Sequence, residues 1–235
     1  LYGHPAPMAE LQGIASRYKL AIFEDAAQAH LAQIDGRVVG TFGHFGVFSF
    51  YPTKNMTSAE GGMVSCEDEA LARKIRVLRN QGMENQYQNE VVGVNNRMTD
   101  LHAAIGRVQL TRLEKWTRKR QENAAKLSSM IVGVSTPKTL KGARHVFHQY
   151  TIRVVGLDRD IFASQLAERG VGTGAYYPVP IHRLPAFDQD LDLPETERAA
   201  REVLSLPVYP SLTEAELIQI ADSVNAVASA GVGRG

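Results

Sequence analysis

The feature that most constrains this chain is the segment at residues 41–62, in which an aromatic run leads to a single lysine and then to paired glycines. The segment reads TFGHFGVFSFYPTKNMTSAEGG. The apolar run from Phe45 to Phe50 predicts a buried strand that ends at Phe50 or Tyr51. Lys54 therefore lies on a loop at the carboxyl end of the strand, which is where open α/β sheets bind their ligands.

A second apolar run supplies an acid for the same edge. Residues 19–23 predict a short buried strand, and Glu24 and Asp25 follow at its carboxyl end. A pyridoxal phosphate site needs a lysine that forms a Schiff base and an acid that keeps the pyridine nitrogen protonated. Lys54 and Asp25 are the candidate catalytic residues. The alternative interpretations are a surface lysine at a strand end and an aspartate that caps the next segment.

An ordered set of motifs resembles one known family. The motifs are EDAAQAH at 24–30, FSFYPTKN at 48–55, EGGMV at 60–64, GVNNRMTD at 93–100, LHAAIGRVQL at 101–110, VFHQYTIRV at 146–154, GAYYPVPIHRLPAF at 174–187 and LSLPVYPSLT at 204–213. Together they are similar to the DegT/DnrJ/StrS sugar aminotransferases and cover almost the whole chain. Each string alone is weak, and the ordered combination makes the resemblance specific.

The resemblance implies an α/β fold, the pyridoxal-phosphate-dependent transferase fold type I of aspartate aminotransferase. We expect residues 1–115 to hold part of a mostly parallel large-domain sheet and residues 116–235 to form a smaller α+β domain. In the family, the turn that cups the cofactor phosphate and several strands of the sheet lie upstream of the segment matching Leu1. We therefore expect the chain to lack an N-terminal part, to expose a sheet edge, and to form no complete active site by itself.

The activity implied by the resemblance is transfer of an amino group from an amino acid, with glutamate as the expected donor, to a nucleotide-linked keto sugar. The implied cofactor is pyridoxal 5'-phosphate. Two alternatives stay open: a pyridoxal-phosphate-dependent sugar dehydratase or lyase, and a non-catalytic, truncated domain that dimerises or regulates. Lys54 stands where dehydratase relatives carry histidine, and this favours the aminotransferase.

Five further site residues follow from the resemblance. Gln28 corresponds to a glutamine that holds the cofactor ring or its phenolic oxygen, and Ser49 to a serine that binds the phosphate. Asn95 corresponds to an asparagine that reaches the neighbouring subunit's cofactor phosphate, which implies a homodimer with shared active sites. Tyr177 and His182 match a proline-rich crossing near the substrate. The structural alternatives are backbone contacts for Gln28, a small strand residue at Ser49 and a turn-stabilising Asn95.

Two positions depart from the family pattern, and one histidine is given no chemistry. Leu31 and Ala59 stand where glycine is common, and a side chain there is strained if the backbone needs a positive φ. His30 is interpreted as a packed core histidine.

Composition gives no support for nucleic-acid binding, a membrane location or a disulfide-stabilised secreted fold. Lys and Arg number 26 against 25 Asp and Glu, so the near-neutral charge gives no reason to expect a nucleic-acid or membrane partner. The single cysteine, Cys66, cannot form an internal disulfide, which favours a reducing compartment such as the cytoplasm. No apolar run reaches the length of a membrane span, and we expect no metal site.

Overall fold

A computed structural model describes residues 1–232 of the chain, so the last three residues of the expected C-terminal domain lie outside the described residues. The chain forms two compact units. The first unit comprises residues 3–118 and 139–148 together with Leu1. The second comprises residues 119–138 and the chain from Gln149 onward, together with Tyr2. The domain boundary near residue 115 stays a prediction.

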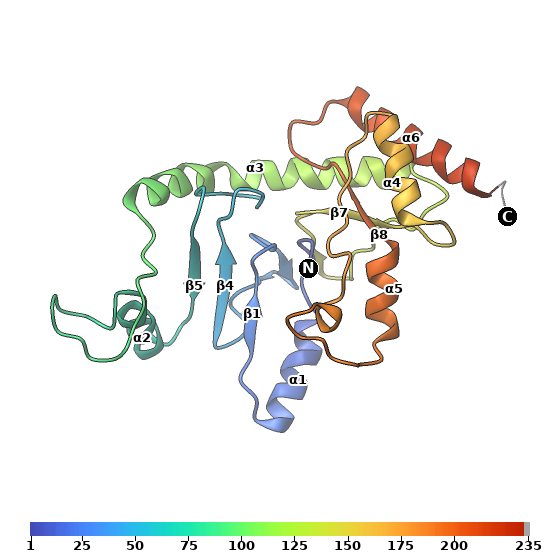
Figure 1. Cartoon of the computed structure of the whole chain (residues 1–235). Coiled ribbons are helices and arrows are strands. Elements are labelled where there is room, and N and C mark those ends of the chain that lie inside the picture. The colour runs from blue at the N-terminus through green and yellow to red at the C-terminus, as the bar shows by residue number, and fades with distance from the viewer. Residues whose placement is uncertain (233–235) are drawn as a thin grey trace. The chain divides into compact units, whose positions relative to one another are not determined.

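The first unit contains both helices and short strands, and the second consists mainly of helices (Figure 1). The first unit holds α1 (Met8–Tyr18), β1 (Phe23–Asp25), β2 (Gln33–Ile34), β3 (Arg37–Val38), β4 (Phe45–Ser49), β5 (Gly62–Ser65), α2 (Glu69–Arg79), most of α3 (Asp100–Met130) and β6 (Ala143–Arg144). The second holds the end of α3, then β7 (Tyr150–Arg153), α4 (Arg159–Glu168), the 3-10 turn η1 (Ile181–Arg183), α5 (Pro194–Glu202), β8 (Val203–Leu206) and α6 (Glu214–Val232).

The main sheet of the first unit has the strand order β1-β4-β5, and Figure 1 shows these strands side by side. β1 and β4 are parallel, with Asp25 paired to Val47, so their carboxyl ends lie at the same edge. β5 runs antiparallel to β4, with Ser49 paired to Gly62. The pairing of β1 with β4 therefore brings the two predicted strand ends together.

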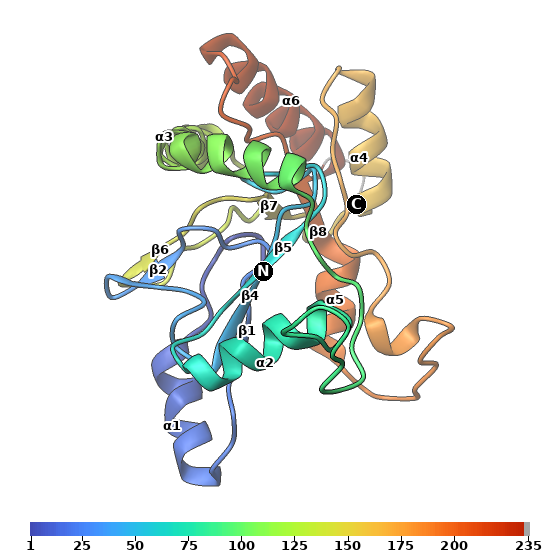
Figure 2. The same cartoon turned by 90° about the vertical axis from the view of Figure 1, so that its left-hand side faces the viewer.

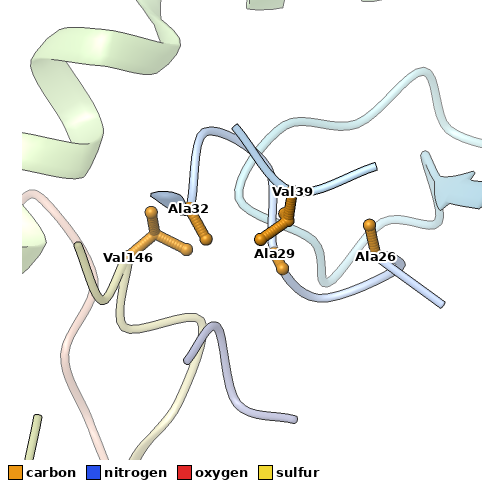
Figure 3. Packing of buried hydrophobic residues seen from close by; sticks show 5 residues of the cluster. All are labelled: Ala26, Ala29, Ala32, Val39 and Val146. Atoms are coloured by element: carbon orange, nitrogen blue, oxygen red, sulfur yellow. The ribbon is translucent and has the colours of Figure 1, made fainter. Parts of the chain in front are cut away.

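The chain after β1 contributes β2 and β3 to a short three-stranded sheet of order β3-β2-β6, and Figure 2 shows β2 beside β6. Between β1 and β2 the chain makes two successive turns, in which the N–H of Ala29 bonds to the carbonyl of Ala26 and the N–H of Ala32 to the carbonyl of Ala29, each at 2.9 Å. These alanines pack with Val39 and Val146 in one buried cluster (Figure 3). Small side chains allow this tight packing, which fixes the chain immediately after Asp25.

The first strand begins and ends later than the sequence predicts, so Asp25 lies within it. We expected a strand over residues 19–23, whereas β1 spans Phe23–Asp25. The residues before it complete the preceding helix, because Lys19 adopts a left-handed conformation as the C-cap of α1 and the N–H of Leu20 bonds to the carbonyl of Ala15 at 2.8 Å. Asp25 is thus the last residue of the strand rather than a residue that follows it.

The second unit contains an antiparallel pair, β7 and β8, with helices α4, α5 and α6. The motif LSLP at 204–207 was not predicted to be a strand. All four residues of β8 are buried, so the polar and apolar alternation that identifies a half-buried strand is missing. Asp158 caps α4 by accepting hydrogen bonds from the N–H groups of Asp160 and Ile161, each at 2.9 Å.

Candidate active site

Asp25 ends β1 at the carboxyl edge of the β1–β4 pair and is exposed. Its Oδ1 accepts a hydrogen bond of 3.0 Å from the N–H of Ala27. Among the described residues, its second oxygen, Oδ2, accepts none. The capping contact expected from the structural alternative is therefore present, and one carboxylate oxygen remains available to a ligand at the same edge.

Lys54 lies on the loop that follows β4, as the aromatic run predicts. The loop leaves β4 at Phe50 and folds back onto the same residue. The carbonyl of Phe50 accepts hydrogen bonds from Ser58 N–H at 3.0 Å and from Thr57 Oγ1 at 2.9 Å. Within it, the N–H of Lys54 bonds to the carbonyl of Tyr51 at 3.0 Å. The backbone that carries the lysine is therefore closed into a small, fixed ring of contacts.

The two residues after Lys54 anchor this loop in the core. Asn55 is 5% exposed and donates from Nδ2 to the carbonyl of Val146 at 3.0 Å. Met56 packs in a buried cluster with Phe50 and Leu113. Lys54 itself is half-buried and makes no ion pair with any carboxylate in the described part of the chain. A surface lysine normally projects into water, so this position departs from the default for a lysine at a strand end.

Ser49 and Gln28 lie close in sequence to these two residues. Ser49 is the last residue of β4, and its Oγ accepts a 3.3 Å hydrogen bond from the N–H of Tyr51. Because the hydroxyl is the acceptor there, its own proton stays available for a phosphate oxygen. Gln28 is half-buried in the turn that follows Asp25.

The sequence analysis gave no role to Glu24. In the structure, Glu24 connects β1 to the segment that precedes β4. Its buried carboxylate accepts hydrogen bonds from the N–H groups of Gly40 at 2.6 Å, Phe42 at 2.5 Å and Gly43 at 2.7 Å. A Cβ on Gly40 would lie 2.4 Å from the ring of Phe48, and one on Gly46 would lie 2.4 Å from the Cα of Gly40. The glycines before the aromatic run are the signal that could have identified this contact, since they let the backbone approach closely.

His30 is a buried side chain at the same edge, as the core interpretation expects. It is 4% exposed, and its ring lies 5.6 Å from that of Phe48 and 5.9 Å from that of Phe50. Burial lowers the pKa of His30 to about 4; a backbone hydrogen bond with Ser49 opposes this change, and the charge of Lys54 adds to it. The imidazole is therefore neutral near pH 7.

Asn95 lies in the loop between α2 and α3 and is exposed. The loop returns to the end of α2, where the N–H of Asn96 bonds to the carbonyl of Arg79 at 2.9 Å. Arg97 donates from Nε to Asn95 Oδ1 at 3.1 Å and from Nη1 to Asn80 Oδ1 at 3.0 Å. Because Oδ1 of Asn95 already accepts from Arg97, the side-chain N–H groups of Asn95 are the groups that can bind a ligand.

Tyr177 and His182 belong to the second unit, whereas Lys54, Asp25, Gln28, Ser49 and Asn95 belong to the first. Tyr177 is exposed. His182 is 7% exposed, and its Nε2 lies 3.2 Å from Glu197 Oε1, an oxygen that also accepts from Arg183 Nη2 at 2.8 Å. The substrate roles of Tyr177 and His182 stay predictions.

The two positions that depart from the family's glycines both adopt left-handed backbone conformations. φ is 65° at Leu31 and 67° at Ala59. The side chain of Leu31 packs against both buried clusters of the first unit, whereas Ala59 is exposed.

Within residues 1–232, no three His, Cys, Asp or Glu side chains are grouped so that they could hold a metal ion. None of the helices in this range has the apolar length that crossing a bilayer requires.

Residues 1–225 match the family model described as the DegT/DnrJ/EryC1/StrS aminotransferase family. The chain belongs to this family. It is 41% identical over 234 residues to a "Pleiotropic regulatory protein" of Geobacillus stearothermophilus, covering 95% of this chain and 62% of the relative. It is 39% identical over 232 residues to a dTDP-3-amino-3,4,6-trideoxy-alpha-D-glucose transaminase of Streptomyces venezuelae, covering 95% and 61%.

A solved structure confirms the fold class. The crystal structure of S. venezuelae DesV in complex with a ketimine intermediate superposes with a TM-score of 0.92 at 39% identity, over 97% of this chain and 63% of that one. The chain therefore has the aminotransferase fold expected from the motifs. It spans 61–62% of the length of the two curated relatives named above.

Proposed function

We propose that the protein is a pyridoxal-phosphate-dependent aminotransferase that moves an amino group from an amino acid, with glutamate as the expected donor, to a nucleotide-linked keto sugar. The observation that carries this proposal is the parallel pairing of β1 with β4, since it sets Asp25 and the Lys54 loop at one sheet edge. Membership of an aminotransferase family and the likeness to a dTDP-sugar transaminase support it.

The residues at this edge fit the cofactor by their chemistry. Oδ2 of Asp25, the unpaired amine of Lys54 and the hydroxyl proton of Ser49 are polar groups that the described chain itself leaves without partners. An acid, an amine and a hydroxyl donor are what a pyridine nitrogen, an aldehyde and a phosphate require. We assign the ring nitrogen to Asp25, the covalent attachment to Lys54, the phosphate to Ser49 and the ring or its phenolic oxygen to Gln28.

When bound, pyridoxal phosphate supplies the electron sink that makes a carbanion accessible at the amino donor's α-carbon. Lys54, once its amine is released by the donor, takes the proton from that α-carbon as general base and later returns a proton as general acid. Asp25 holds a negative charge beside the pyridine nitrogen and keeps it protonated. The fixed loop around Lys54 limits the positions the amine can take, which favours a productive geometry.

We further propose a homodimer with shared active sites, in which the amide N–H groups of Asn95 reach the partner subunit's cofactor phosphate. The support is the exposed loop position of Asn95 and the contact from Arg97 that orients its amide. Tyr177 and His182 are proposed to lie near the sugar. A soluble, cytoplasmic location is proposed from the single cysteine and the biosynthetic relatives.

The test is to supply pyridoxal phosphate and glutamate to the full-length protein and to measure release of 2-oxoglutarate. Borohydride reduction followed by mass spectrometry should place the cofactor on Lys54, and Lys54→Ala should abolish both signals. Lys74→Ala, which changes an exposed lysine on α2, is the matched control and should leave both intact. A covalent adduct that persists in Lys54→Ala would remove Lys54 from this role.

A second candidate is a non-catalytic regulatory protein of the same fold. The regulatory name of the 41% identical relative favours it. Under this alternative the wild-type protein would bind the cofactor, or dimerise, without releasing 2-oxoglutarate from glutamate. Ping-pong kinetics with a nucleotide-linked keto sugar as acceptor would support the aminotransferase. Consumption of the sugar without amine transfer would support a dehydratase or lyase.

A further inference from the structure

The imidazole of His30 is a buried polar group whose hydrogen bonds are unaccounted for. By distance and angle, neither Nδ1 nor Nε2 completes a hydrogen bond, although both atoms are shielded from solvent and the backbone of Ser49 lies close enough to the ring to raise its pKa against the effect of burial. Buried donors and acceptors without partners are destabilising, so native proteins rarely leave them so unless a ligand, a water or a moving side chain completes them. His30 has no role in the proposed reaction, although it lies beside the strand end that leads to Lys54.

The surroundings of His30 restrict what can complete it. The ring lies beside Phe48 and Phe50, the two aromatic residues that flank Ser49 at the end of β4. Phe50 is also the residue on which the Lys54 loop closes, through the hydrogen bonds to its carbonyl from Thr57 and Ser58. His30 is therefore packed against the base of the loop that carries the lysine.

Lys54 is the charged side chain that acts on this ring. Its positive charge lies near enough to help hold the pKa of His30 low, after burial, which has the largest effect. A neutral imidazole has one N–H donor and one acceptor nitrogen, and an amine or ammonium group is a natural donor to that acceptor. A phosphate is a poorer partner, because a neutral ring brings no charge to meet the dianion.

We propose that His30 is a positioning residue for Lys54: an acceptor nitrogen of the neutral imidazole takes a hydrogen bond from the Lys54 side chain and holds the amine when it is not attached to the cofactor. The catalytic part of this inference rests on the proposed function. It gives the released lysine a defined resting place between its tasks as base and acid, and it supplies a donor to the acceptor nitrogen of the ring.

A double-mutant cycle in the full-length protein without added cofactor tests the contact directly. The unfolding equilibrium is measured in urea for the wild type, His30→Leu, Lys54→Met and the double variant. We expect His30→Leu to change the unfolding constant by a factor that differs about tenfold between the two backgrounds, as a hydrogen bond from a charged group predicts. Additive effects of the two substitutions would overturn the proposal, and this arm requires no enzymatic activity.

The second arm uses the first half-reaction with glutamate. His30→Leu should slow it about tenfold with little change in cofactor affinity, because one hydrogen bond that orients the reacting amine is lost. His30→Gln keeps an acceptor and should restore most of the rate. If His30→Gln is as slow as His30→Leu, the ring matters only for packing and the inference fails. If the wild type shows no half-reaction, the proposed function fails, while the unfolding cycle still decides the contact.

Discussion

The carboxylate of Glu24 accepts a 2.6 Å hydrogen bond from the backbone N–H of Gly40, and this contact ties β1 to the loop that leads into β4. Two more N–H groups, of Phe42 and Gly43, bond to the other oxygen of the same carboxylate. A hydrogen bond to a charged acceptor contributes more stability than a hydrogen bond between two neutral groups. The contact therefore sets the spacing of the two strands whose ends carry Asp25 and the Lys54 loop.

Replacing this carboxylate by an amide should weaken the first unit. Glu24→Gln keeps one acceptor oxygen but turns the other into an NH₂ group that faces a backbone N–H. We expect unfolding free energy to fall by about 2–4 kcal/mol, from lost charge-assisted bonds and an unpaired donor. Urea unfolding measures this. Glu10→Gln on the exposed surface of α1 is the control and should change little; an equally small loss in Glu24→Gln would contradict the structural role.

Substitution of Asp25 by asparagine separates its two interpretations. Asparagine keeps the oxygen that accepts from the N–H of Ala27, and it caps as well as aspartate, so stability should change by less than about 0.5 kcal/mol. It lacks the negative charge that keeps the pyridine nitrogen protonated. If Asp25 has the proposed role, turnover should fall by about a hundredfold, the scale of a lost electrostatic contact in an active site.

The readout is the rate of 2-oxoglutarate release together with urea unfolding of the same variant. Asp25→Ala serves as the comparison, because it loses both the cap and the charge and should lower stability by about 1 kcal/mol as well as turnover. Full activity in a stable Asp25→Asn variant would leave capping as the only function of this residue.

Local patterns were sufficient to predict the position of Lys54 on the loop after β4. The local signals are also clear in two helices: Pro7 directly precedes α1, and Thr99 at the start of α3 accepts from the N–H of His102. These elements have strong periodic or capping signals within a few residues of one another.

The rest depended on contacts between distant residues. β8 is buried along its whole length, so it lacks an alternating pattern. The place of Asp25 within β1 follows from pairing with β4, and the hydrogen bonds of Glu24 come from residues 16 to 19 positions away. The departures at Leu31 and Ala59 were visible as missing glycines, but only the structure gives their positive φ angles. Sequence patterns report local preferences, and such long-range pairings override them.

Restoring glycine at position 59 should stabilise the protein. Ala59 has φ of 67° and is exposed, so its methyl group brings strain without burial. Ala59→Gly should raise the unfolding free energy by about 0.5–1 kcal/mol after the added freedom of the unfolded chain is subtracted. Ala104→Gly, at an exposed position within α3, is the matched control and should lower it by about 1 kcal/mol. Equal losses in the two variants would show that the left-handed conformation carries no strain.

Leu31 should respond in the opposite way, although its φ is similar at 65°. Its side chain packs against both buried clusters of the first unit, and truncation to glycine removes that burial. We expect Leu31→Gly to lower the unfolding free energy by about 1–3 kcal/mol, because lost packing outweighs the relief of backbone strain. Urea unfolding of Leu31→Gly beside Ala59→Gly tests this, and stabilisation by both substitutions would contradict it.

Acid should destabilise the protein partly through His30. The pKa of this ring falls to about 4 in the folded state, chiefly by burial, with the charge of Lys54 adding to the change, against about 6.5 in an unfolded chain. The unfolded chain therefore binds a proton that the folded protein excludes. This contribution to stability is complete above about pH 6.5 and is lost as the pH falls towards 4, by up to about 3 kcal/mol.

Urea unfolding of the wild type and of His30→Leu between about pH 4.5 and 8 measures this contribution to stability, because leucine cannot titrate. The variant should show a shallower loss of unfolding free energy with falling pH. Some loss should remain, since burial lowers the pKa of His145 to about 3, with the charge of His4 adding to the effect. Parallel pH profiles for the two proteins would show that His30 is protonated as easily in the folded state as in the unfolded chain, which its burial among Phe48 and Phe50 argues against.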